Sequence, residues 1–147
     1  MPSFKLGMNA VAYYGTAGET DPTNLTALTN VRDVNLNFET GEADVTTRAN
    51  SGWRATAATL KECTAEFEMV WKPGDAGFEA LRNAWLNSTE LAMAFLDDAY
   101  DASQAEGPVG DFTITNFSRS EPLEEAIIVN VTAKLSSFGQ WFDAGSI

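Results

Sequence analysis

The stretch AEFEMVWKPGDAGFEALRNAWLN, residues 65–87, changes its apolar period in the middle and thereby indicates the class of the fold. Its first half alternates apolar side chains with Glu66 and Glu68. A period of two is typical of a strand that buries one face and leaves the other polar. We therefore expect this half to form a half-buried strand.

The second half of the same stretch predicts a helix. After the Pro-Gly pair, apolar residues recur at spacings of three and four, at Phe78, Leu81 and Trp85. These spacings put all three on one face of a helix, and Asp75 is a suitable N-cap residue. The sequence therefore predicts one amphipathic helix over about 75–86.

Further strands are expected on both sides of this helix. The alternation recurs at residues 11–15, 34–38, 112–114 and 127–134. Residues 91–96 are apolar at every position, which indicates a strand covered on both faces. At Asn116-Phe117 the alternation shifts by one position, as a β-bulge would cause. The order of elements predicts a mainly β protein, an antiparallel β-sandwich or barrel with one flanking helix.

Length and composition limit the class of protein. A chain of 147 residues predicts a single domain over residues 1–147. Because 44% of the residues are apolar, the chain can bury a core and is not of the disordered class. The longest apolar run, 91–96, is far shorter than the roughly 20 residues that a membrane span needs. No secretory signal is visible at the N-terminus, so we expect an intracellular protein at synthesis.

Charge and missing residue types argue against catalysis and nucleic-acid binding. Nine Lys and Arg stand against 21 Asp and Glu, and the cations do not cluster, which disfavours tight binding to DNA or to anionic membranes. The chain has no histidine, the commonest general base and metal ligand. Cys63 is the only cysteine, so no intrachain disulfide is possible. We expect no enzyme, no catalytic or metal-binding residue and no cofactor.

Two acidic groups leave alternatives open. Five acids fall in an expected connection at 97–111, namely Asp97, Asp98, Asp101, Glu106 and Asp111. Carboxylates suit Ca²⁺, but their spacing lacks the alternating ligands and central glycine of a Ca²⁺ loop, which favours a solvated acidic loop. Glu66 with Glu68, or Glu124 with Glu125, can supply a glycosidase pair, but no other residue marks a cleft.

The connection at about 40–59 is the most informative segment. It has a length that is usual only for functional or disordered loops. Trp and Arg are typical anchors of protein interfaces. The candidate contact residues in this long inter-strand loop are Glu42, Asp44, Arg48, Trp53 and Arg54. The alternative is that Trp53 folds back onto its own core.

The C-terminal segment 136–147 raises the same question. Phe138, Trp141 and Phe142 come after the last expected strand, where few core positions remain. They pack either on this core or on a neighbouring subunit, because an exposed apolar tail is a liability in a monomer. Together with the long loop, this possible tail indicates a subunit of an assembly.

The chain resembles a known family in three segments. These are NVRDVNLNFETGEADVTTRANSGWRATAATLKE at 30–62, AEFEMVW at 65–71 and DFTITNFSRSEPLEEAIIVNVTAKL at 111–135. They are similar to the major tail protein, or tail tube protein, of long non-contractile-tailed bacteriophages. The resemblance runs from about Phe4 to Lys134 and keeps the order of strands, long loop and helix.

The resemblance implies a structural virion protein with no catalytic function. Members of the family fold as a β-sandwich or barrel with a flanking helix. They form hexameric rings that stack into a tube around a tape-measure protein, between tail-terminator and tail-tip proteins, and DNA passes through without tight binding. The location implied is the virion tail, and the host cytoplasm during assembly. The long loop would reach an adjacent ring through Arg48, Trp53 and Arg54, whereas the aromatic C-terminus has no clear counterpart.

If neighbouring sheets join edge to edge in such a ring, the free strand edges are satisfied by closure. The polar faces of the strands would then line the lumen. The candidates are Asn35, Asn37, Glu66, Glu68, Asn130 and Thr132. A negative lumen would repel phosphates and let DNA slide.

Two other classes of protein remain open from the sequence. One is a related tube in a contractile tail, a phage-like bacteriocin or a gene transfer particle. The other is a carbohydrate-binding β-sandwich, in which Trp53 and Trp141 would be flat stacking platforms.

Overall fold

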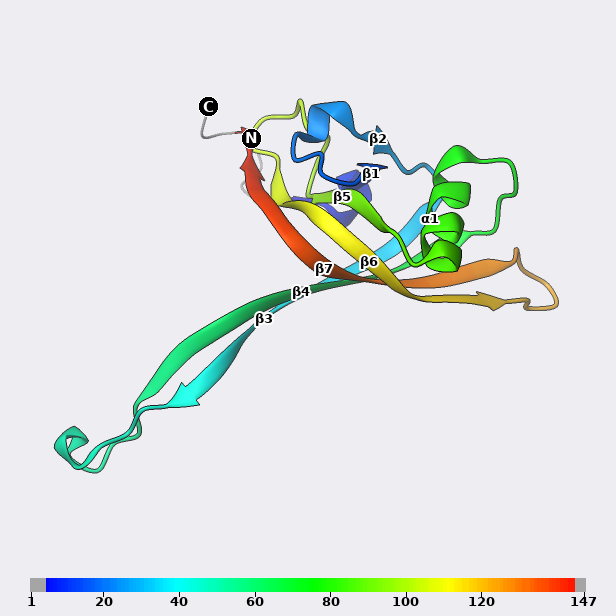
Figure 1. The fold of residues 1–147 in the computed structure, drawn as a ribbon. Helices are drawn as coiled ribbons and strands as arrows, with labels where there is room; N and C mark the ends of the chain where they lie inside the picture. The colour runs from blue at the N-terminus through cyan, green and yellow to red at the C-terminus, as the bar shows by residue number, and fades with distance from the viewer. Residues whose placement is uncertain (1–4, 145–147) are drawn as a thin grey trace.

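Seven strands and one α-helix make up the part of the chain that the computed structural model describes, residues 5–144 (Figure 1). The strands are β1 (Val11–Thr16), β2 (Thr26–Ala27), β3 (Val31–Asp44), β4 (Thr56–Val70), β5 (Glu90–Leu96), β6 (Glu106–Ser120) and β7 (Ile128–Asp143). The helix α1 spans Ala76–Asn87, and short 3₁₀ turns lie at Gly7–Asn9, Pro22–Asn24 and Arg48–Asn50. Within residues 5–144 no helix reaches the length and apolarity that crossing a membrane requires.

All seven strands belong to one antiparallel sheet in the order β2-β1-β5-β6-β7-β4-β3. The sheet bends so that its two halves face each other. Phe67 on β4 and Phe95 on β5 lie three strands apart in this order, yet their ring centroids are only 6.0 Å apart. The mainly β fold with a single helix is confirmed, and its two layers come from one bent sheet.

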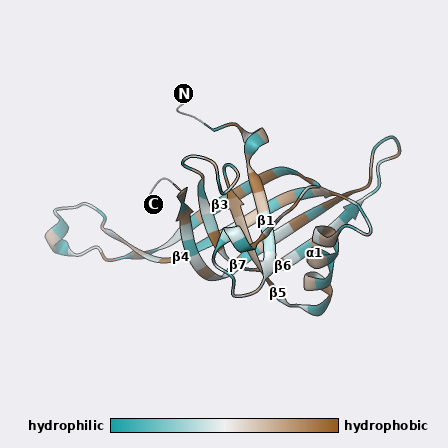
Figure 2. Ribbon diagram, turned by 90° about the horizontal axis from the view of Figure 1, so that it is seen from above, coloured by the Kyte–Doolittle hydropathy of each residue, from teal (hydrophilic) through white to brown (hydrophobic). Residues whose placement is uncertain are grey.

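Strand β5 is covered on both faces, as its sequence predicts. Met93 and Phe95 belong to the main core between the sheet halves and the helix. Ala92, Ala94 and Leu96 point the other way, into a second core that includes Tyr13 of β1. Figure 2 shows the alternation of the other strands as brown and teal bands.

The helix forms where the change of period predicts it. The Asp75 carboxylate accepts a hydrogen bond from the Phe78 N–H at 3.0 Å and caps the N-terminus. Phe78 is fully buried, with its ring 4.8 Å from that of Trp71. The expectation for Trp85 is wrong, because this side chain is exposed while Ala84 occupies the buried position in the last full turn.

The β-bulge predicted near Asn116 is present. On β6, Ile114 pairs with Ala133 and Asn116 pairs with Thr132, so Thr115 is the extra residue. The bulge shifts the phase of β6 and turns Asn116 to the exposed face. Such a local irregularity is readable from sequence because it changes the alternation itself.

The long connection expected at 40–59 is mostly a hairpin. Strands β3 and β4 continue pairing as far as Asp44 opposite Thr56, so only residues 45–55 connect them. Pairing between β4 and β7 ends at Thr64 opposite Lys134, and beyond it the hairpin projects from the body as a two-stranded arm (Figure 1). Neither face of this arm is covered, so its sequence shows no apolar alternation that would indicate strands.

The C-terminal aromatic residues are part of a strand, which corrects the expected tail at 136–147. Strand β7 runs to Asp143, with Trp141 opposite Pro108 and Phe142 opposite Gly107 on β6. The connection before β6 is correspondingly shorter than expected, because that strand begins at Glu106. Residues 145–147 lie outside the described part of the chain.

Gly107 allows β5 and β6 to approach closely at this point. A Cβ atom at position 107 would collide with the backbone carbonyl oxygen of Phe95, which cannot move aside as a flexible side chain can. We expect Gly107→Ala to lower the free energy of unfolding by about 1–3 kcal/mol, the usual cost of overpacking.

The measurement for Gly107→Ala is the urea midpoint of the purified protein. Gly7→Ala is the matched control, because a Cβ there meets no atom within 4 Å. Equal urea midpoints for Gly107→Ala and Gly7→Ala would show that β5 and β6 accommodate the added Cβ atom without loss of stability.

Candidate assembly surfaces

The tip of the arm, residues 45–55, is a locally folded turn. Thr46 donates its backbone N–H to Asp44 at 2.9 Å, and its hydroxyl accepts the Ala55 N–H at 2.9 Å. These contacts with Thr46 hold the pKa of the Asp44 carboxyl below its usual value. Ser51 and Gly52 then reverse the chain with positive φ angles of 52° and 84°.

The five loop residues predicted as contacts are all brought onto the arm. Glu42 and Asp44 lie on β3, opposite Ala58 and Thr56, rather than in the loop. Trp53 is 79% exposed, so the alternative that it packs on its own core is wrong. Arg48 and Arg54 make no ion pair with any residue between 5 and 144.

The six residues predicted for a polar face share the outer face of strands β3, β4 and β7. Asn35 pairs with Glu66, which pairs with Thr132, and Glu68 pairs with Asn130. Asn37 follows two positions along β3 on the same face. Their neighbours in sequence, such as Phe67 and Val131, point into the core instead.

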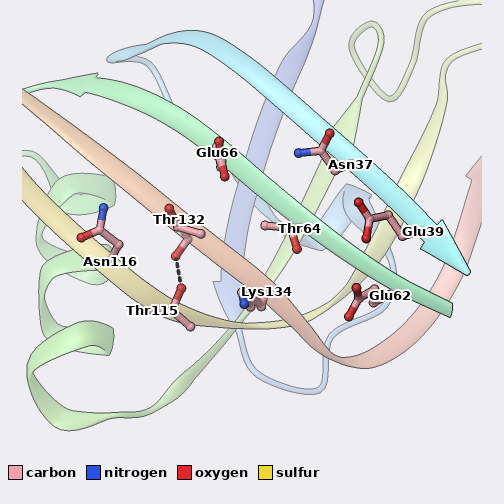
Figure 3. A pocket seen from close by; sticks show the side chains of 9 residues that line it. All are labelled: Asn37, Glu39, Glu62, Thr64, Glu66, Thr115, Asn116, Thr132 and Lys134. Atoms are coloured by element: carbon pink, nitrogen blue, oxygen red, sulfur yellow. Dashed lines mark hydrogen bonds between the residues drawn. The ribbon is translucent and has the colours of Figure 1, made fainter. Parts of the chain in front are cut away.

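A groove of about 530 Å³ crosses this polar face (Figure 3). Its lining includes six residues that sequence reasoning missed, namely Glu39, Glu62, Thr64, Thr115, Asn116 and Lys134. The same period of two predicts all but Asn116, which the bulge turns outward. Glu39 lies directly opposite Glu62, and like charges in that arrangement repel. Lys134 is the only cation among the residues that line the groove.

A second groove, of about 1310 Å³, opens between β3 and the junction of β5 with β6. Val34 and Phe38 face it and remain exposed, which corrects the expectation that they are buried. They are uncovered because β3 is an edge strand that the other half of the sheet does not reach. Trp141 closes one side, with its ring centroid 5.6 Å from Phe38 and its indole N–H donating to Glu106 at 2.7 Å.

The three C-terminal aromatic residues have different surroundings. Phe142 packs against the second core, so part of the expected tail belongs to this chain's own interior. Trp141 is exposed beside the second groove, and Phe138 is exposed on β7. Trp53 and Trp141 lie on the arm and on the body respectively, and do not form one platform.

Two open strand edges flank the four strands β3-β4-β7-β6 within the described part of the chain. The outer edge of β3 has no partner strand within residues 5–144. The β5–β6 pairing ends at Thr113, so residues 114–120 of β6 also have one unpaired edge. These edges lie on opposite sides of the four strands β3-β4-β7-β6.

Four of the five acids between 97 and 111 are engaged by other groups of this chain. Asp97 accepts the Glu106 N–H at 3.0 Å, Asp98 pairs with Lys5 at 3.4 Å, and Asp111 accepts the Gly18 N–H at 2.8 Å. Among the described residues, no three His, Cys, Asp or Glu side chains converge on one point. Glu66 and Glu68 do share a face, but it is the open polar face.

Cys63 lies on β4 between Glu62 and Thr64, which line the groove of the polar face. Its own side chain belongs to the main core on the opposite face. Burial raises the pKa of its thiol. The thiol therefore stays protonated to a higher pH than a free cysteine, and its side chain packs in the main core.

Solved structures share this fold. The tail of an empty gene transfer agent particle, refined with C6 symmetry, aligns with a TM-score of 0.71 and 16% identity, over 95% of this chain and 98% of that one. A chain from the virion of a native gene transfer agent particle gives 0.70 and 14%, over 95% and 98%. The SPP1 tail tube gives 0.72 and 13%, over 95% and 78%.

Sequence comparison gives the family. A search of curated proteins finds no significant match. The family model described as phage tail tube protein matches residues 7–141. The match covers nearly the whole chain and includes both the arm and the strands of the polar face. The chain therefore belongs to the phage tail tube protein family.

Proposed function

We propose that this protein is the subunit of hexameric rings that stack into a phage tail tube. The observation that carries the proposal is a four-stranded sheet with two open edges, one continuous polar face and a projecting arm. Support for six subunits comes from the C6 symmetry of the gene transfer agent tail that shares this fold. The tail of the virion is then the site of function, after assembly in the host cytoplasm.

Ring closure uses the two open edges. The outer edge of β3 in one copy pairs with residues 114–120 of β6 in the next, which satisfies the free backbone groups. Such a heterologous contact closes into a ring when its rotation matches the symmetry. The neighbour also covers Phe38 and Val34, and it covers the exposed Trp141, whose ring centroid lies 5.6 Å from that of Phe38. The exposed Phe138 of β7 is a further candidate for a contact between subunits.

The polar face lines the lumen in this arrangement. Glu66 and Glu68, with Asn35, Asn37, Asn130 and Thr132, give it a negative and hydrogen-bonding surface. DNA phosphates are repelled from such a surface, so DNA passes through without tight binding. A tape-measure protein occupies the lumen before DNA, and terminator and tip proteins close the ends. The whole chain acts as one structural domain without enzymatic activity or a cofactor.

The arm connects rings along the tube axis. It projects beyond the body, and its tip carries Arg48, Trp53 and Arg54 as contact residues. Exposed aromatic and Arg side chains of this kind are typical hot spots of protein interfaces.

Electron microscopy of the concentrated protein at two salt levels, with mass measured in parallel, tests the proposal. The net charge of −12 makes stacked copies repel one another. The screening length falls from about 30 Å near 0.01 M salt to about 8 Å near 0.15 M. We expect hollow tubes at the higher salt and a several-fold lower yield at the lower salt.

Other results would contradict parts of this proposal. An equal tube yield at both salt levels would overturn the electrostatic argument. Monomers at every concentration, with tryptophan fluorescence quenched by sugars, would favour the carbohydrate-binding class instead.

A further inference from the structure

We infer that the arm tip, residues 45–55, of one copy binds the β6–β7 turn, residues 121–127, of a copy in the next ring. The inference rests on the proposed tube and identifies the surface that receives the arm. Three independent features of the two segments support it, namely their positions, their charges and their exposed apolar residues.

The two segments lie at opposite ends of the same sheet (Figure 1). The register shows the same arrangement, because β4 begins at the arm and ends with Val70 opposite Ile128, next to the β6–β7 turn. A stack in which every copy contacts the next in the same way needs complementary surfaces at opposite ends. The arm and this turn meet that requirement.

The charges of the two segments are opposite. The arm tip contains Arg48 and Arg54 and no acid, although the whole protein is strongly acidic. The turn contains Glu121, Glu124 and Glu125 and no cation. Electrostatic complementarity of this kind selects the partner surface and fixes its orientation.

Part of the turn is already occupied within the chain, which defines the free part. Glu121 pairs with Arg119 at 3.0 Å, and Arg119 lies 4.8 Å from the centre of the Trp71 ring. Glu124 and Glu125 are exposed and form no ion pair with any residue of the described range 5–144. They are therefore available to Arg48 and Arg54 of another copy.

Each segment also presents one large apolar side chain to solvent. Leu123 at the turn is 98% exposed, and Trp53 at the arm tip is 79% exposed. An aromatic anchor with a surrounding set of charges is the usual arrangement of an interface hot spot. A contact between the arm tip and the β6–β7 turn removes both Trp53 and Leu123 from water. Single exposed ion pairs are weak, but the contact repeats around the ring and gains by multivalency.

Charge exchange between the two segments tests the inference. One variant carries Arg48→Glu and Arg54→Glu, and the other carries Glu124→Arg and Glu125→Arg. We expect each alone to lose at least tenfold in tube yield, at the salt level where the wild type assembles. An equal mixture of the two variants should form tubes again, because rings of one variant can alternate with rings of the other. Every arm tip then meets a β6–β7 turn of opposite charge.

The matched control is Lys5→Glu with Arg82→Glu, which makes the same change in net charge as the arm-tip variant at residues outside the arm, the β6–β7 turn and the open strand edges. It should assemble as the wild type does, and circular dichroism checks that every variant is folded. Tubes from either variant alone, or no recovery in the mixture, would overturn the inference while the wild-type tubes leave the proposed function intact. Failure of the wild type to form rings or tubes would instead contradict the proposed function.

Discussion

Replacing Phe112 by Ala is expected to lower the free energy of unfolding by about 3–5 kcal/mol, a large part of the roughly 5–15 kcal/mol of a typical domain. Phe112 is 0% exposed on β6, and its ring centroid lies 5.3 Å from that of Phe95 in an edge-to-face contact. Its partners in register are Leu91 on β5 and Leu135 on β7. Truncation therefore leaves a cavity between strands whose backbones are fixed by pairing.

Urea unfolding followed by circular dichroism measures this effect. The matched control is Phe138→Ala on the adjacent strand β7, because Phe138 is 58% exposed in the isolated chain. We expect the control to change the free energy of unfolding by less than about 0.5 kcal/mol. Similar losses for the two variants would mean that the core does not lie between the two halves of the sheet.

Removal of the arm tip is expected to abolish tubes while leaving the subunit as stable as before. Asp44 and Thr56 are directly paired, so an Asn-Gly pair can replace residues 45–55 as a two-residue hairpin turn. No residue of 45–55 belongs to either core, so the melting temperature should stay within about 2 °C of the wild type. The expected products are single rings or monomers under conditions where the wild type forms tubes.

Two measurements separate the possible outcomes for the shortened arm. A thermal melt shows whether the subunit is folded, and electron microscopy shows whether rings and tubes are present. Tubes of normal length and yield from the shortened protein would show that the arm does not connect rings. A large fall in the melting temperature would show that the tip stabilises the body, contrary to its exposure.

The period of the apolar residues determined much of this fold from the sequence alone. It predicted the strand over 65–70, the helix capped by Asp75 and the bulge beside Asn116. It also predicted the two buried faces of β5. These features are local, since each depends on which side a residue faces relative to its neighbours in the chain. The six polar-face residues were predictable for the same reason.

Only the tertiary structure decided which segments pair and which faces are covered. The arm forms because β3 and β4 pair beyond the body, and its exposed faces carry no periodic signal. Phe38 has the spacing of a core residue but remains exposed, because β3 lies at the edge of the sheet. The C-terminal aromatic residues extend β7 because β6 is long enough to pair with them. Pairing partners and coverage depend on residues far apart in the chain, and alternation along one segment carries no information about them.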